Sequence, residues 1–480
     1  MRDAQQSICV IGGGFTGIAT ALACLTELKQ PFRLVLVEPK ASLGLGVAFG
    51  AQHPLHLLNV RTRDLSVRAG QPGDFLNWAY HQLDQGENHE ELHESLAHTF
   101  LPRQLFGEYV RQRFFEAVQD RRDVALRIVN EAATSCIAED GRFRVGFATA
   151  QSLVADVVFV ATAYGLRESP PSGAVLPYDA ALSDELVAAK TMALLGTGPT
   201  MVDALLAARR NGFQGKAIAI SRRGQLPRSH APKGVVPLNV ELPNFKKVSA
   251  LTQAVRIACE FAQAEGTPWQ AVFNGLRPSL QSLWQDLSLD EQRRFLRHVR
   301  PFWDAHRHRL PIEIHARLAE ELKAGTLELM HGRVVRSERV PGGFAVTVKK
   351  RGASEPDIIR TGLAFDCTGH RADLTSPLIK SLLASGAASA DPHGLGLVTS
   401  ADGQSVGARG AVTEGLFALG PLCQGTLWEI TAVPEIVAQA TGAAKTCACI
   451  LMSHAERSGK VARRFTVSCR RRNRCFLASG

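Results

Sequence analysis

Two glycine-rich turns are the part of this chain best suited to bind a ligand. The sequence GGGFTG occupies positions 12–17, directly after the apolar segment Ile8–Ile11. The sequence GTGPTM occupies positions 196–201, directly after Met192–Leu195. In a strand–turn–helix unit the first glycine permits a tight turn, the second lets a pyrophosphate approach the backbone, and the third lets the helix pack on the strand. The helix N-terminus then presents free N–H groups and a positive dipole end to the phosphates.

Each turn is followed by a helical pattern, a second β-rich segment and a residue that distinguishes two classes of nucleotide. That residue is Glu38 in the first unit and Arg222, followed by Arg223, in the second. A carboxylate suits the ribose of FAD or NAD, whereas guanidinium groups favour the 2′-phosphate of NADP. The alternative is that either turn is a generic βα corner, and the second carries Met201 in place of the third glycine. We therefore expect an FAD site at Gly12, Gly14, Gly17 and Glu38, and an NADP site at Gly196, Gly198, Arg222 and Arg223.

The remaining patterns predict an α/β protein with two Rossmann-like domains, the second inserted in the first, as in glutathione-reductase-like folds. Both apolar segments that end in ATAYG (161–165) and DCTG (366–369) leave a strand in the same way, as expected where the chain leaves and re-enters one nucleotide domain. We predict an FAD-binding domain from segments 1–188 and 362–455, an NAD(P)-binding domain over 189–361 with a helical insertion at about 245–325, and a basic tail over 456–480.

Composition excludes several other classes of protein. The ten cysteines include no C-x-x-C pair, which argues against disulfide-reductase flavoproteins, and Cys9, Cys24, Cys367 and Cys447 lie in apolar segments typical of a core. The formal charge of +10 comes mostly from the tail, which we interpret as a solvated terminus. The alternative is an electrostatic contact with anionic lipid, nucleic acid or an acidic partner. The most apolar stretch, Val154–Ala163, is too short to span a membrane, and no signal peptide precedes the first strand. We expect a cytoplasmic protein, and its oligomeric state stays open.

With these motifs in place, the chain resembles a bacterial FAD/NAD(P)-binding family of two-dinucleotide-domain flavoproteins. The matching segments extend from residue 11 to about 440 and include FLPRQLFGEYV, SRRGQLPRSH, RFLRHVRPFWDAHRHR and GPLCQGTLWEITAVPEI. The group is similar to flavin-dependent N-hydroxylating monooxygenases, some relatives of which oxidise the amino group of aspartate. The resemblance implies FAD, NADPH or NADH, a small-molecule substrate and O₂. Ala163 replaces the usual glycine of the exit, and Pro421 replaces an FAD-binding aspartate, so Gly420 is expected to supply that contact.

Further FAD contacts are expected around the flavin ring. Gly44 and Gly46, in a glycine-rich stretch that should run close to a ligand or another backbone, and Asn59 are candidates, with a turn-capping role as the alternative for Asn59. Arg103 would pair with a phosphate or with an acidic surface. Trp428 would form a pocket wall or belong to the core. Thr431 is a candidate N-cap for a helix over about 433–452, whose N-terminus, in the related fold, points at the flavin pyrimidine.

A basic cluster in the predicted insertion supplies candidate substrate residues. Arg307 and Arg309, in the segment HRHR, form either a solvated basic face or a site for a phosphate or carboxylate, and His230 closes a loop that would contact nicotinamide nucleotide or substrate. The histidines have no accompanying acidic or cysteine cluster, so we predict no metal site. No catalytic base stands out, because in a flavoenzyme the cofactor performs the difficult chemistry.

Three functions follow in order of preference. The first is an FAD-dependent, NADPH-consuming monooxygenase that acts on a small amine or amino acid through a C4a-hydroperoxyflavin. The second is an NAD(P)H-dependent flavin reductase or dehydrogenase that passes electrons to an acceptor other than O₂. The third is a flavin-bearing sensor or scaffold that contacts a partner through the helical insertion or the tail.

Overall fold

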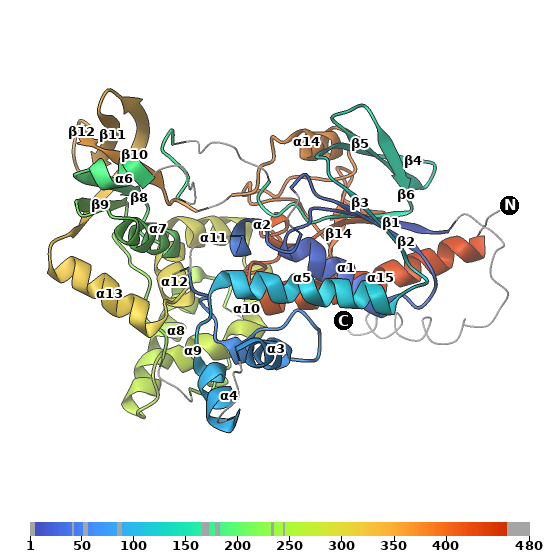
Figure 1. Cartoon of the computed structure of the whole chain (residues 1–480), viewed down its shortest axis with the longest axis horizontal. Coiled ribbons are helices and arrows are strands. Elements are labelled where there is room, and N and C mark those ends of the chain that lie inside the picture. Colours follow the sequence, from blue (N-terminus) through green and yellow to red (C-terminus); the bar gives the residue numbers. More distant parts are fainter. Residues whose placement is uncertain are drawn as a thin grey trace.

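The computed structural model describes residues 5–40, 43–50, 56–83, 89–165, 172–177, 183–231, 235–242, 245–369 and 371–457. The predicted tail lies outside these ranges apart from its first two residues. Two six-stranded sheets lie at opposite ends of the molecule, and a group of helices lies beneath them (Figure 1).

The first sheet has the strand order β14-β15-β7-β1-β2-β3, with β1 at its centre. Its strands are β1 (Ser7–Ile11), β2 (Arg33–Val37), β3 (Ala125–Val129), β7 (Val157–Val160), β14 (Gln404–Val406) and β15 (Val412–Ala418). All neighbouring strands are parallel except β14 and β15. β1 and β7 are buried along their whole length, as continuous apolar runs are when both faces of a parallel sheet are covered.

Different layers cover the two faces of this sheet. On one face, Ile8, Val10 and Leu34 pack with the helices α1 (Phe15–Glu27), α5 (Arg103–Asp120) and α15 (Val433–Arg457). On the other face, Cys9, Ile11 and Val35 pack with α14 (Pro377–Ala384) and a three-stranded sheet of β4 (Ala133–Glu139), β5 (Arg142–Phe147) and β6 (Ser152–Ala155). The short helices α2 (Gly46–Phe49), α3 (Asp74–Leu83) and α4 (His89–His98) complete this part.

The second sheet has the order β12-β11-β10-β9-β8-β13, and β10, β9, β8 and β13 are parallel. Its strands are β8 (Thr191–Leu195), β9 (Lys216–Ser221), β10 (Leu327–Val340), β11 (Gly343–Lys350), β12 (Asp357–Thr361) and β13 (Leu363–Asp366), and α6 (Ser183–Ala188) precedes them. One face packs on α7 (Pro199–Arg210) and α13 (Ile312–Lys323). On the other face, side chains of β8, β9 and β13 cluster with side chains of β11 from the same sheet. Both sheets therefore place the strand that precedes a glycine turn between two parallel neighbours, as in a dinucleotide-binding fold.

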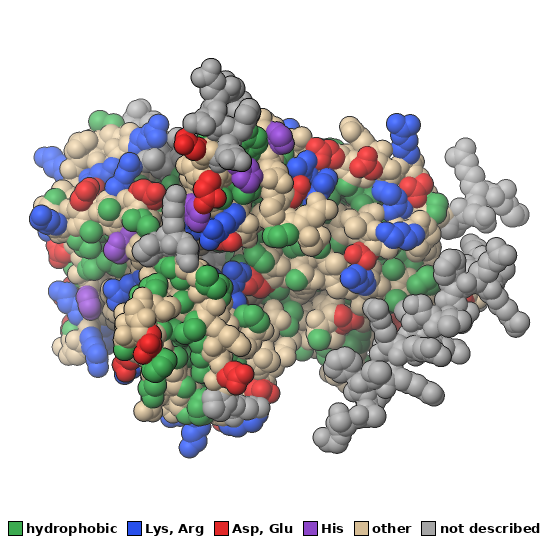
Figure 2. All heavy atoms as spheres, turned by 90° about the horizontal axis from the view of Figure 1, so that it is seen from below, with side chains coloured by type: hydrophobic (Ala, Val, Ile, Leu, Met, Phe, Trp, Pro, Cys, Tyr) green, Lys and Arg blue, Asp and Glu red, His purple; other side chains and the backbone are tan. Residues whose placement is uncertain are grey.

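The chain between β9 and α13, where the sequence predicts an insertion, contains a group of helices. They are α8 (Val248–Ala264), α9 (Gln270–Gly275), α10 (Leu280–Asp286), α11 (Leu289–Arg294) and α12 (Arg300–Arg307). α8 buries only Val248 and Ala262, and its Phe261 is 66% exposed. The face seen from below accordingly shows hydrophobic side chains among charged ones (Figure 2).

The structure corrects three details of the sequence interpretation. β13 pairs with β8, so the boundary predicted at residue 362 is too early, and the segments 161–165 and 366–369 follow strands of two different sheets, β7 and β13. α13 packs in the core of the second sheet, so it is the crossover helix before β10 rather than part of the insertion. Among the described residues, α15 is long and apolar enough to cross a membrane, a helix that the sequence interpretation did not consider for this role; its Ala440, Ala443 and Leu451 pack in the core beside α1.

Candidate active site

The first glycine turn joins β1 to α1 and lies against the end of β7. Gly12 adopts a φ of +109°, and a Cβ on it would meet the Ala161 carbonyl oxygen at 2.5 Å. A Cβ on Gly17 would lie 1.7 Å from the Gly12 oxygen. Both positions require glycine, the first for its backbone angle and the second for the close approach of the helix to the strand.

The N-terminus of α1 has the features of an anion site. Its N-cap residue, Gly14, offers no side-chain hydrogen bond, and the first turn contains no acidic residue. The first N–H groups of a helix need an acceptor, and the oxygens of a pyrophosphate supply one. The turn therefore fits the phosphates of a dinucleotide.

Glu38 is fixed beside this turn at the end of β2. Its Oε2 accepts the Gly13 N–H at 2.7 Å, and its Oε1 accepts the Lys40 N–H at 3.0 Å. These two bonds hold the carboxylate at the position from which it would accept ribose hydroxyls.

The glycine-rich stretch after β2 packs on the same turn. The Gly44 N–H donates to the Gly13 oxygen at 2.8 Å, and Gly46 has a φ of +54°. A Cβ on Gly46 would lie only 3.2 Å from the Gly14 Cα. The expectation that this stretch runs close to another backbone is confirmed, and Gly46 stands directly beside the predicted pyrophosphate position.

The second glycine turn repeats the first with one difference. Gly196 adopts a φ of +121°, and a Cβ on it would meet the Cys367 oxygen at 2.3 Å. Gly198 is the N-cap of α7, with no side-chain cap and with Pro199 in the first turn. Where the first unit has Gly17, the buried side chain of Met201 packs in the core of the second sheet, so this position tolerates a large side chain.

The two candidate phosphate-binding arginines follow β9. Thr197 of the turn bonds Ser221 Oγ at 3.0 Å and the Gln225 oxygen at 2.7 Å, which ties the loop containing Arg222 and Arg223 to the turn. Arg222 is exposed, and the guanidinium of Arg223 lies 5.8 Å from the Phe302 ring centroid. Within the described ranges neither arginine forms an ion pair, so both are available to a 2′-phosphate.

Gly420 is positioned by the chain's return to the first sheet. It has a φ of +65°, its N–H donates to Gln439 Oε1 at 2.8 Å, and a Cβ on it would meet Thr16 Oγ1 at 2.6 Å. Gly420 therefore lies against α1, but its own N–H already has a protein acceptor.

Trp428 lies in a core between the insertion and the loop before α15. Its ring stacks on Trp284 at 4.9 Å, meets Phe295 edge-on at 5.3 Å, and lies 5.5 Å from the Arg300 guanidinium. Of the two roles considered for Trp428, the packing matches a core tryptophan.

The adjacent Glu429 has a role that the sequence did not reveal. It is 4% exposed and has a φ of +67°. Its Oε1 accepts the Trp303 Nε1–H at 2.7 Å, and its Oε2 lies 3.2 Å from Arg307 Nε. Although desolvation opposes ionisation, the charge of Arg307 leads the effects that lower the pKa of Glu429. Arg307 is thus paired within the protein.

The prediction that Thr431 caps the last helix is wrong. α15 begins at Val433, and the Thr431 N–H donates to the Glu429 oxygen at 2.7 Å. The helix starts at Val433 as predicted, but the left-handed backbone at Glu429 places Thr431 in a tight turn instead of at the N-cap.

Asn59 and Arg103 connect the two halves of the molecule. The Asn59 backbone oxygen accepts the Nε2–H of His230 at 2.8 Å. Arg103 Nε donates to the Leu57 oxygen at 3.0 Å, and its Nη2 lies 2.8 Å from Asp203 Oδ2 of α7. Of the two partners considered for Arg103, the structure places an acidic one beside it, the carboxylate of Asp203.

His230 and Arg309 lie together at the junction of the first domain, the second domain and the insertion. Burial leads the effects that lower the pKa of His230 to about 4, and the charges of Arg309, Arg61 and Arg307 add to it. Arg309 is 5% exposed and donates to Asn274 Oδ1 at 2.5 Å. These two substrate candidates are therefore brought together, while Arg61 joins them without any signal in the sequence.

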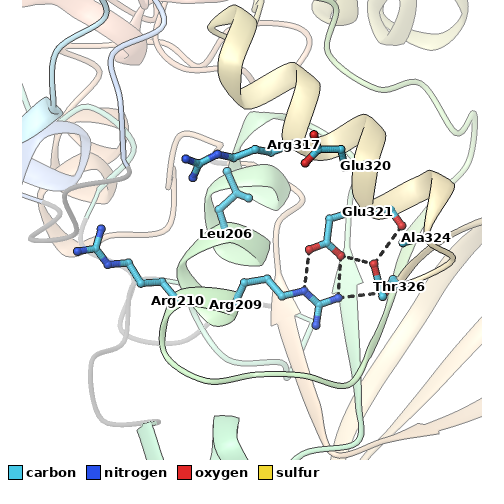
Figure 3. Close-up of a pocket in the computed structure, with 8 residues that line it drawn as sticks. All are labelled: Leu206, Arg209, Arg210, Arg317, Glu320, Glu321, Ala324 and Thr326. Atoms are coloured by element: carbon cyan, nitrogen blue, oxygen red, sulfur yellow. Dashed lines mark hydrogen bonds and ion pairs between the residues drawn. The ribbon is translucent and has the colours of Figure 1, made fainter.

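A separate hollow between α7 and α13 contains none of the predicted site residues (Figure 3). Arg209 bonds both carboxylate oxygens of Glu321 at 2.8 Å and the Thr326 oxygen at 3.2 Å. Since these bonds join the two helices and β10, we interpret the hollow as structural.

The described residues contain no group of three or more metal-ligating side chains. The cysteines that the structure describes are all free, and Cys9, Cys24, Cys367 and Cys447 are buried, as the sequence predicted.

Comparisons with known proteins agree with this geometry. Residues 9–165 match a family model described as FAD-NAD(P)-binding, so this part of the chain is an FAD/NAD(P)-binding domain. A search of curated proteins found no match.

Solved structures show the same fold at low sequence identity. The reduced form of an ornithine hydroxylase from Pseudomonas aeruginosa is 14% identical, with 93% of this chain and 99% of that chain covered and a TM-score of 0.59. An ornithine N-hydroxylase from Kutzneria sp. 744, with reduced FAD, NADP⁺ and L-ornithine, is 15% identical (94% and 99%, TM-score 0.57). An L-lysine 6-monooxygenase from Pseudomonas syringae is also 15% identical (95% and 99%, TM-score 0.56). The chain therefore has the fold of two-dinucleotide-domain flavoproteins.

Proposed function

We propose that this chain is an FAD-dependent oxidoreductase that consumes NADPH and oxygenates the nitrogen of a small amine or amino acid. The proposal rests on two glycine turns, each followed by a helix without a side-chain N-cap and each accompanied by side chains of opposite charge. Glu38 lies beside the first turn, and Arg222 and Arg223 are tied to the second. One turn thus suits a nucleotide with free ribose hydroxyls, and the other suits a nucleotide with a 2′-phosphate.

The residues present have defined tasks in such an enzyme. The N–H groups at the start of α1 would bind the FAD pyrophosphate, and Glu38 would accept hydrogen bonds from its ribose. The N–H groups at the start of α7, with Arg222 and Arg223, would hold NADPH. Bound FAD supplies hydride acceptance from NADPH and the subsequent reaction with O₂.

The cysteines favour oxygenation over disulfide reduction. Burial raises the pKa of Cys9, Cys24, Cys136 and Cys423, so these thiols stay protonated at neutral pH. A reductase that uses a cysteine pair needs a thiolate within reach of its substrate. The fold is shared with an ornithine N-hydroxylase, which supports the choice of an amine as the group oxidised.

The test is a coupled assay on the purified full-length chain loaded with FAD. NADPH and O₂ consumption would be followed with a panel of amines and amino acids, and products would be identified by mass spectrometry. We expect one O₂ consumed per NADPH and a product heavier by one oxygen atom with at least one amine. Rapid NADPH oxidation that yields only H₂O₂ with every amine would contradict the proposal. Flavin reduction followed by slow reoxidation in air would point instead to a reductase with another acceptor.

A further inference from the structure

Arg309 lies where three parts of the chain meet. It follows α12, and the next residue, Leu310, forms backbone bonds of 2.9 and 3.0 Å with Arg228 and His230 of the loop after β9. The His230 ring contacts Phe100 of the first domain, with ring centroids 4.8 Å apart. Ligand sites occur preferentially at such junctions.

The positive charges around Arg309 exceed the carboxylates that neutralise them. Arg277 binds both oxygens of Glu435 at 2.7 and 2.9 Å, and Arg307 is paired with Glu429. Arg61 donates only to backbone oxygens, those of His98 and Ala231 at 3.0 and 2.6 Å. In the part of the chain that the structure describes, neither Arg61 nor Arg309 has a carboxylate within ion-pair distance.

Buried guanidinium atoms at this junction have no acceptor. Arg309 Nε and Arg307 Nη2 are inaccessible to solvent and make no hydrogen bond in the described structure, whereas Arg307 Nε lies 3.2 Å from Glu429 Oε2. Burial, followed by the charges of Arg307, Arg277 and Arg61, lowers the pKa of Arg309 to about 10. Buried guanidinium groups require acceptors, and an oxyanion can accept two of their N–H groups at once.

The His230 ring completes the arrangement. Since its Nε2–H donates to the Asn59 oxygen, the neutral ring leaves Nδ1 without a proton. A bound anion would offset the neighbouring guanidinium charges, and protonated Nδ1 could then donate to it.

We propose that Arg309, with Arg307 and Arg61 beside it and His230 at its edge, forms an anion site that binds the carboxylate or phosphate oxygens of a small ligand. The ligand group is either a carboxylate of the molecule to be oxidised or a phosphate of the nicotinamide nucleotide. Anion binding is measured at equilibrium and without turnover, so this site is tested independently of the redox chemistry proposed above.

The experiment is a calorimetric titration of the full-length chain with succinate, inorganic phosphate and NADP⁺. We expect saturable binding of succinate or phosphate, at least tenfold weaker in Arg309→Gln and intermediate in Arg309→Lys, which keeps the charge but loses the planar fork. Arg293→Gln, an exposed arginine of the insertion that is 57% accessible, is the matched control and should bind like the wild type.

The NADP⁺ titration distinguishes the two sources of the anion. Loss of succinate binding with NADP⁺ binding retained in Arg309→Gln would identify a substrate carboxylate. Parallel loss of phosphate and NADP⁺ binding would identify a nucleotide phosphate. Absence of saturable anion binding to the wild type, or equal affinity in Arg309→Gln, would overturn the proposal.

A measurement on the wild type avoids dependence on the folding of a variant. The chemical shift of the His230 imidazole would be followed by NMR as a function of pH. The titration would be done without the anion and with the anion at a concentration far above its dissociation constant. We expect the anion to raise the pKa of His230, whereas an unchanged titration would contradict a site at this position.

Discussion

Arg103 and Asp203 join the two dinucleotide-binding parts of the chain through an ion pair of 2.8 Å. Arg103 is the first residue of α5, which covers the first sheet, whereas Asp203 lies in α7, the helix that starts at the second glycine turn. Their side chains are 19% and 10% exposed, so this contact is shielded from solvent. It ties the helix that starts at the second glycine turn to the helix that covers the first sheet.

The first prediction concerns this contact. Arg103→Gln should lower the free energy of unfolding by about 2–4 kcal/mol, because it leaves a shielded carboxylate without its counter-charge. The double variant Arg103→Gln/Asp203→Asn should recover part of that loss, as expected for coupled residues. Urea unfolding of the wild type, both single variants and the double variant measures the coupling.

An exposed pair provides the control for this cycle. Arg144 and Glu139 are 48% and 43% exposed, so replacing either should change the free energy of unfolding by less than about 1 kcal/mol. Strict additivity of the Arg103 and Asp203 variants would show that their ion pair contributes nothing to the domain contact.

The second prediction concerns Gly17. Gly17→Ala should destabilise the protein by about 2–3 kcal/mol and reduce FAD retention, because the new methyl group would overlap the Gly12 oxygen. Thermal unfolding and the ratio of flavin to protein absorbance measure the two effects. Gly442→Ala in α15, where nothing lies within 4 Å of the new Cβ, should stabilise by up to about 1 kcal/mol. Wild-type FAD retention in Gly17→Ala would refute the role given to the first turn.

Local signals were sufficient to predict the dinucleotide-binding units. A glycine turn, the preceding apolar run and the residue that ends the next strand lie within about 30 residues, as the fingerprint requires. The apolar segments Ile8–Ile11 and Met192–Leu195, which precede the two turns, agree with β1 and β8 to within one residue. Gly12 and Gly196 then contact equivalent carbonyl oxygens at Ala161 and Cys367.

The sequence patterns could not predict contacts between residues far apart in the chain. Asp203 is one acidic residue among many on amphipathic helices, and nothing local marks it as the partner of Arg103. Likewise, Glu429 adopts a left-handed backbone that glycine usually occupies, because Trp303 and Arg307 of the insertion hold its carboxylate. Thr431 was misassigned as an N-cap for the same reason, since the turn that contains Thr431 depends on the distant contacts of Glu429.

The third prediction concerns the choice of nicotinamide nucleotide. Arg222→Ala/Arg223→Ala should raise the KM for NADPH by about 10- to 100-fold, corresponding to one or two charge-assisted hydrogen bonds, and leave the KM for NADH nearly unchanged. Steady-state oxidation of NADPH and of NADH by the FAD-loaded enzyme gives the two KM values. Arg210→Ala, which removes an exposed arginine at the end of α7, is the control and should not change the KM for NADPH relative to the KM for NADH. An equal effect of the double variant on NADPH and NADH would mean that these arginines do not contact the 2′-phosphate.

The last prediction concerns stability against pH. The pKa of His230 is lowered to about 4 by burial first and then by Arg309, with Arg61 and Arg307 adding to it. The unfolded chain, with the ordinary pKa of about 6.5, binds the proton more readily, so protonation favours unfolding. The stability conferred by the neutral ring is therefore complete above about pH 6.5 and is lost as the pH falls towards 4, by at most about 3 kcal/mol.

His230→Gln separates this effect from other groups. His306, whose pKa burial also lowers, contributes in the same direction, so the informative quantity is the difference between the two proteins. Between pH 7 and 4.5 the free energy of unfolding should fall less steeply in His230→Gln, whereas His81→Gln, at an exposed position, tests whether the loss of any imidazole has the same result. Adding the anion that occupies the Arg309 site should also flatten the wild-type curve, because it compensates the guanidinium charges that keep His230 neutral. Identical slopes in the wild type and His230→Gln would mean that burial and the neighbouring arginines do not lower the pKa of His230 in the folded protein.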